Sequence, residues 1–132
     1  MLAIRAAASG KHASATLYAF CVQCGMLFVE TPYFTRFCEN HCSDDELREL
    51  QRLLIEHPDA GDLMRGSKGL RKVRWALPGR GKRGGARVIY FWRSAAGTIY
   101  LLYAYAKNDQ AELSAQQRKM LSEWIQEVLG DE

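Results

Sequence analysis

The stretch that decides the fold is GLRKVRWALPGRGKRGGARVIYF, residues 69–91, which carries seven Lys and Arg and no acid. Two runs rich in β-branched, aromatic and basic residues flank a connection rich in Gly, as is typical of paired antiparallel strands. We expect strands at about 69–76 and 86–93, joined by the loop LPGRGKRGG. Because like charges close together oppose folding, this density of positive charge indicates a negatively charged partner.

The rest of the chain sharpens that inference, because its net charge of +3 averages strongly opposed blocks. Residues 63–108 hold eleven Lys and Arg and no acid, whereas residues 30–62 have a net charge of −6. Residues 1–29 and 109–132 have net charges of +2 and −4. Such segregation predicts a polyanionic partner for the middle block. A merely solvated basic face is the alternative, although such runs are more common on helices than on glycine-rich strands.

Three N-cap pairs mark the helix starts: Thr31 with Pro32, Ser43 with Glu46, and Ser114 with Gln117. The first helix is expected to end near His41, and HPDAG (57–61) to stop the second. Residues 27–30 and 98–106 read as further strands. The fold class is therefore α+β with the order β-α-α-β-β-β-α, in which a small curved antiparallel sheet packs with helices.

The domain is expected to span residues 26–132. Residues 1–25 are rich in Ala and Ser and contain no acid, and we expect a disordered extension or an upstream mis-called start, with Met26 as the true start. The sequence has no apolar run long enough for a membrane span. The chain is therefore expected in the cytoplasm, without a membrane partner.

Four cysteines, Cys21, Cys24, Cys38 and Cys42, lie in the first third of the chain. Their spacing superficially resembles a zinc-ligand pattern. The intervening residues read as a strand and a helix start rather than as the turns of a zinc ribbon, so we favour free cytosolic thiols and expect no metal.

Strand alternation predicts which cations converge. Lys72 and Arg74 share one face of their strand, and Arg87 opens the next strand close to that pair. A phosphate group would relieve their mutual repulsion, and guanidinium groups bind it in a bidentate manner. The flexible loop contributes Arg80, Lys82 and Arg83, which suit a nucleic-acid backbone. Possible stacking surfaces for bases are Tyr90, Trp92, Tyr100, Tyr103 and Tyr105, although core packing is the expected role of most of them.

This basic block contains no carboxylate cluster that could hold two catalytic metal ions. RNA can be cut without metal when its 2′-hydroxyl attacks the adjacent phosphate, given a base, an acid and cations for the developing charge. A lysine acts as a base only when neighbouring positive charges favour its neutral form. Lys72, beside Arg74 and Arg87, is the candidate.

Four stretches cover most of the chain from about Met26 to Val128: FVETPYFTRF, HPDAGDLMRGSKGLRKVRWA, GRGKRGGARVIYF and YLLYAYAKNDQAELSAQQRKML. In these stretches the sequence resembles the RelE/HigB superfamily of type II toxin–antitoxin toxins, most closely its HigB-like branch.

The resemblance implies an endoribonuclease that cuts messenger RNA on the translating ribosome without a cofactor. It also implies an antitoxin partner, in this branch usually with a helix-turn-helix DNA-binding domain, through which the toxin would reach operator DNA. It places Lys72, Arg74 and Arg87 in the catalytic site, with Lys107 and Asn108 as further basic or polar site residues. Arg71, on the same basic strand, is expected to hold RNA together with Arg80, Lys82, Arg83 and Lys107. Well-studied members also have a tyrosine early in the last helical segment, which here reads AELSAQQ. Without it, the general base is Lys72 or Lys107.

Three alternatives stay open from the sequence. The same fold hosts ParE-type toxins, which inhibit DNA gyrase. A degenerate copy would grip RNA or an antitoxin without cutting, and a small basic scaffold protein would belong to no such family.

Overall fold

The computed structural model describes residues 4–7, 17–21, 26–77, 85–107, 110 and 112–130, with the backbone alone for the first two ranges. The helices are α1 (Pro32–His41), α2 (Asp44–Glu56) and α3 (Ala115–Gly130), with a 3₁₀ turn, η1, at Ser94–Ala96. The strands are β1 (Ile4–Ala7), β2 (Leu17–Cys21), β3 (Met26–Glu30), β4 (Asp62–Leu63), β5 (Arg71–Trp75), β6 (Ala86–Arg93) and β7 (Thr98–Ala106).

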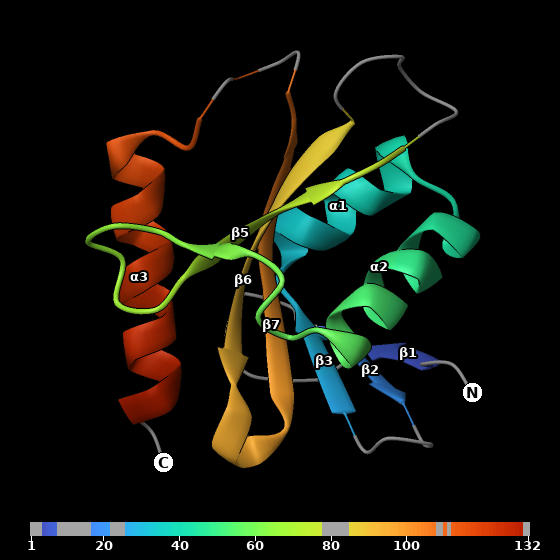
Figure 1. The fold of residues 1–132 in the computed structure, drawn as a ribbon, viewed down its shortest axis with the longest axis horizontal. Coiled ribbons are helices and arrows are strands. Elements are labelled where there is room, and N and C mark those ends of the chain that lie inside the picture. The colour runs from blue at the N-terminus through green and yellow to red at the C-terminus, as the bar shows by residue number, and fades with distance from the viewer. Residues whose placement is uncertain are drawn as a thin grey trace.

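One sheet joins all these strands in the order β1-β2-β3-β7-β6-β5-β4 (Figure 1). Neighbouring strands are antiparallel except for β3 and β7, which run parallel with Leu27 opposite Thr98. The parallel pair follows from the chain path, because α1, α2 and β4–β6 separate β3 from β7 in the sequence. The central strands β5, β6 and β7 form the antiparallel meander that the sequence predicted.

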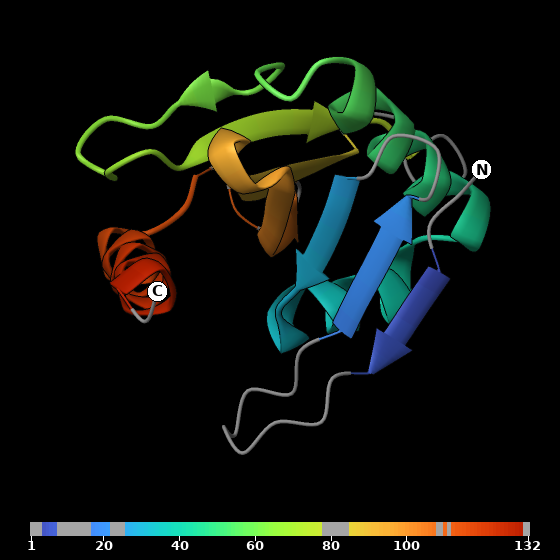
Figure 2. The ribbon, with the colours of Figure 1, turned by 90° about the horizontal axis from the view of Figure 1, so that it is seen from below.

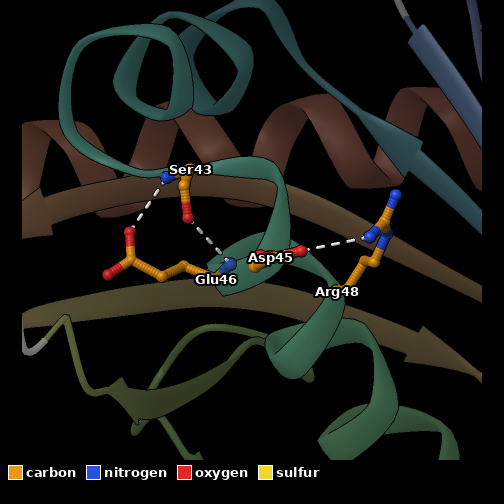
Figure 3. Close-up of polar contacts among 4 residues, drawn as sticks. All are labelled: Ser43, Asp45, Glu46 and Arg48. Carbon is orange, nitrogen blue, oxygen red and sulfur yellow. Dashed lines mark hydrogen bonds and ion pairs between the residues drawn. The ribbon is translucent and has the colours of Figure 1, made fainter.

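The N-cap pairs explain where the helices begin. Thr31 caps α1, with its Oγ1 accepting from the amide of Phe34 and donating to the carbonyl of Leu102, which ties the helix start to β7. Ser43 and Glu46 form a reciprocal capping box at α2, at 3.1 and 2.9 Å (Figure 3). Each such cap satisfies amides that the first helical turn leaves without partners.

The helices cover opposite sides of the sheet. Figures 1 and 2 show α3 on one side of β5–β7, with α1 and α2 on the other. The α1/α2 side buries an apolar cluster that includes Phe34, Leu54 and Trp75. The α3 side buries a second cluster that includes Ile89 and Leu121. We call these the α1/α2 face and the α3 face.

The structure confirms the predicted α+β class and the position of every predicted helix. It adds the two-residue strand β4 and the parallel pairing, which the sequence did not indicate. The boundary at residue 26 stays a prediction, and the segment before it contains the described strands β1 and β2, paired beside β3. None of the helices in the described ranges has the length and apolar character needed to cross a membrane.

Candidate functional site: a basic row on the α3 face

The centre of the candidate site is a row of three residues across β5, β6 and β7. Arg74 lies directly opposite Arg87, and Arg87 lies directly opposite Tyr105. Directly opposed residues of antiparallel strands project to the same side, with Cβ atoms about 5 Å apart. Arg74 is exposed and Arg87 half-buried. The row therefore holds two guanidinium groups and a phenol on the α3 face, as predicted for the two arginines.

Gly85 fixes the start of β6 and hence the position of Arg87. Its φ is +54°, and a Cβ there would lie 2.5 Å from the carbonyl oxygen of Trp75. Such a close approach of β5 and β6 leaves room for glycine alone. The carbonyl of Gly85 also accepts from the amide of Lys107 at 3.2 Å, which brings exposed Lys107 to the same end of the sheet as Arg87.

Lys72 lies on the same face as Arg74, but its surroundings differ from the prediction. Its cross-strand neighbours are Ile89 on β6 and Asp62 on β4. The block of residues 63–108 contains no acid. However, Asp62, the last residue of the acidic block before it, pairs with β5 and lies opposite Lys72. The assignment of Lys72 as general base remains a proposal.

Arg71 lies on the α1/α2 face, with Val73 and Trp75, as alternation predicts. Its guanidinium Nη1 donates to the carbonyl oxygen of Gly61 at 2.7 Å and to that of Asp59 at 3.4 Å. These bonds anchor the segment between α2 and β4. Arg71 thus has a structural task on the side of the sheet away from Arg74 and Arg87. Of the other predicted RNA-binding residues, Arg80, Lys82, Arg83 and Asn108 lie outside the described residues.

Tyr105 was predicted only as one of five possible stacking or core aromatic residues, and its place beside Arg87 was not predicted. It is 3 % exposed, and its hydroxyl has no hydrogen-bond partner in the described part of the chain. Burial raises the pKa of the Tyr105 phenol, while the nearby Arg87 lowers that pKa and Glu112 raises it further. The signal in the sequence was the alternation of Tyr103, Tyr105 and Lys107, which became informative only once the register with β6 was known.

The other aromatic residues proposed as stacking surfaces mostly form the core. Tyr90 and Tyr100 are buried, while Trp92 and Tyr103 are half-buried. The Tyr103 ring lies 6.3 Å from that of Tyr105 and 6.1 Å from that of Tyr33 on α1, measured between centroids. The hydroxyl of Tyr103 accepts from the side-chain amide of Gln117 at 2.9 Å. Core packing is thus confirmed for the two buried rings.

The described residues contain no group of three or more His, Cys, Asp or Glu side chains that could hold a metal ion. Cys38 is buried among the α1/α2 core residues, and the Sγ of Cys42 donates to the carbonyl of Cys38 at 3.5 Å. The side chain of Cys21 and all of Cys24 lie outside the description, so the predicted thiols at these two positions stay a prediction.

The fold and the site together define a class: a small α+β domain with paired arginines on one face of an antiparallel meander. Comparison with known families makes this specific. The family described as the RelE toxin of the RelE/RelB toxin–antitoxin system matches residues 26–130. The chain belongs to this family of toxins. Membership of a toxin–antitoxin family implies a cognate antitoxin partner, as the sequence predicted.

Proposed function

We propose that this protein is a HigB-like toxin that cuts messenger RNA on the translating ribosome and thereby stops translation. The observation that carries the proposal is the direct pairing of Arg74 with Arg87 on an accessible face. Two guanidinium groups at this spacing match the oxygens of a phosphodiester. Membership of the RelE toxin family supplies the biological setting.

In the proposed reaction the 2′-hydroxyl of the RNA attacks the adjacent phosphorus, and the bond to the 5′-oxygen of the next nucleotide breaks. Arg74 and Arg87 stabilise the negative charge of the pentavalent phosphorane. Lys72 or Lys107 takes the proton of the attacking hydroxyl. Because DNA has no 2′-hydroxyl, the reaction is specific for RNA.

Lys107 lies at the same end of the sheet as the arginine pair, and we propose that it holds the RNA backbone or ribosomal RNA together with Arg80, Lys82, Arg83 and Asn108. Arg71 is left out of this set, because its guanidinium is engaged with backbone carbonyls on the other face. We further propose that the cognate antitoxin carries a helix-turn-helix domain, so that the complex reaches operator DNA through the antitoxin alone.

The test is induced expression of the full chain and of its Arg87→Ala variant in a bacterial host. Growth and the 5′ ends of cellular messenger RNA are measured together. The proposal expects growth arrest with new 5′ ends inside coding regions, and the loss of both in the variant. Arg48→Ala is the matched control, because Arg48 is an exposed arginine on α2 paired with Asp45 and should leave both readouts unchanged.

The other outcomes point to the remaining functions. Growth arrest with intact messenger RNA would indicate a ParE-type gyrase inhibitor. Absence of arrest with a folded protein would indicate a module that binds RNA or the antitoxin without cutting. The cross-strand arginine pair supports an RNA target over DNA gyrase, because two phosphate-binding groups lie together on one face.

A further inference from the structure

Two tyrosines on neighbouring strands differ in how their hydroxyls are satisfied. The hydroxyl of Tyr90 on β6 accepts from the amide of Gly61 at 2.9 Å and donates to the carbonyl of Pro58 at 2.7 Å. The hydroxyl of Tyr105 on β7 is also buried and makes no hydrogen bond within the described ranges. A buried polar group without a partner destabilises the folded protein, so such groups are rare and call for an explanation.

The surroundings of Tyr105 point to the explanation. Tyr105 is the direct cross-strand neighbour of Arg87, which is itself opposite Arg74. Arg87 is near enough to act on the ionisation of the Tyr105 phenol. The unsatisfied hydroxyl therefore belongs to the face that carries the two guanidinium groups, and the bonded hydroxyl of Tyr90 belongs to the α1/α2 face.

We infer that Tyr105 is a further ligand-contacting residue of this site, whose hydroxyl donates a hydrogen bond to a non-bridging oxygen of the RNA phosphate held by Arg74 and Arg87. This inference rests on the proposed function and adds a third, neutral donor to the two charged ones. Its role is to hold the phosphate oxygen in the bound state and to stabilise the greater negative charge of the phosphorane.

The protonation state supports a donor rather than a base. Burial raises the pKa of Tyr105 above its ordinary value of 10, so the phenol keeps its proton at neutral pH.

Contact of Tyr105 with a ligand requires a local shift of the surrounding residues, because Tyr105 is covered in the free protein. Glu112 acts electrostatically on Tyr105, and Leu113 belongs to the same apolar cluster. Hydrogen bonds of active sites commonly tighten only once the ligand is bound.

The experiment uses the purified full chain with ribosomes and a defined messenger RNA, and measures the single-turnover cleavage rate. Tyr105→Phe removes the hydroxyl and keeps the ring. We expect cleavage about 10- to 100-fold slower, as when a hydrogen bond to a charged group is lost. The thermal unfolding midpoint should stay the same or rise, since no hydrogen bond within the described ranges is lost. Tyr90→Phe is the matched control, with an unchanged rate and a lower midpoint.

Cleavage by Tyr105→Phe at the wild-type rate would overturn the inference and leave the proposed function intact. Absence of cleavage by the wild type would instead overturn the proposed function. In that case binding of a short 2′-O-methyl RNA, which cannot be cut through its 2′-position, decides the inference. Affinity about tenfold weaker for Tyr105→Phe than for the wild type supports it, and equal affinity overturns it.

Discussion

The two faces of the sheet differ in how one buried tyrosine on each face is satisfied. On the α1/α2 face the indole of Trp75 donates to the carbonyl of Glu46 at 3.2 Å, and the hydroxyl of Tyr90 makes two hydrogen bonds. On the α3 face Arg74 and Arg87 lie side by side, next to the hydroxyl of Tyr105, which has no hydrogen-bond partner among the described residues. Both faces bury apolar clusters that stabilise the fold. The difference lies in the row of Arg74, Arg87 and Tyr105 on the α3 face, which we propose as the site for an anionic ligand.

The largest expected effect on stability comes from the core of the α1/α2 face. Trp75 is buried, stacks on Phe34 with centroids 5.9 Å apart, and contacts Phe37 as well. Trp75→Ala leaves a cavity and removes the hydrogen bond from the indole to the carbonyl of Glu46, so the free energy of unfolding should fall by about 3–5 kcal/mol. Urea-induced unfolding followed by circular dichroism measures this loss. Cleavage per folded molecule should persist at temperatures where the variant is folded.

Arg74 adjoins Trp75 in the sequence but projects to the other face, and this makes the prediction informative. If Trp75→Ala loses its activity while still fully folded, the two faces are not separable. Arg74→Gln is the matched counterpart. It should leave the free energy of unfolding unchanged or slightly higher, because it relieves the repulsion between two cross-strand cations, while cleavage falls.

An effect of intermediate size on the free energy of unfolding should appear at alkaline pH. Burial raises the pKa of both Tyr90 and Tyr105, and for Tyr90 the bond from the Gly61 amide and the charge of Arg71 oppose that rise. In the unfolded chain a tyrosine ionises near pH 10. The stabilisation from each buried phenol is therefore complete below pH 10, and is lost as the pH rises towards the folded-state pKa. The slope is at most about 1.4 kcal/mol per pH unit for each tyrosine.

Urea unfolding of the wild type, Tyr90→Phe and Tyr105→Phe between pH 8 and 11 measures this dependence. Each variant should show a shallower loss of stability above pH 10 than the wild type, since lysines titrate equally in all three. At pH 8 the two variants should differ in their free energy of unfolding. Tyr90→Phe should be less stable than the wild type, whereas Tyr105→Phe should be at least as stable. Equal destabilisation at pH 8 would mean that the hydroxyl of Tyr105 is satisfied in the free protein.

Much of the fold could be predicted because its signals are local. The caps at Thr31, Ser43 and Ser114 each specify a helix start through residues at most three positions apart, and all three are present. The strand at 98–106 was equally legible, since a run of β-branched and aromatic residues ends at the first polar ones. Alternation along 71–75 placed Arg71 and Arg74 on opposite faces, as observed.

What escaped prediction depends on pairing between distant segments. The residues around Asp62 do not predict that it lies opposite Lys72. The strand β4 is only two residues long, which is too short to show the alternation of a strand. The parallel pairing of β3 with β7 likewise joins residues about 70 positions apart. The importance of Tyr105 depends on the register with Arg87, which sequence periodicity leaves undetermined until the β6–β7 connection is known.

The smallest expected effect concerns the N-terminus of α2, on the α1/α2 face. Ser43→Ala removes the acceptor for the Glu46 amide and should lower the free energy of unfolding by about 1 kcal/mol. Figure 3 shows the matched control beside it, the exposed pair of Asp45 and Arg48 at 3.1 Å. Arg48→Ala should cost less than about 0.5 kcal/mol, because water and salt screen such pairs. The two variants, compared by thermal unfolding at equal ionic strength, separate a backbone cap from a surface charge. An equal cost for both would mean that Trp75, which donates to the carbonyl of Glu46, holds this helix turn in place without the cap.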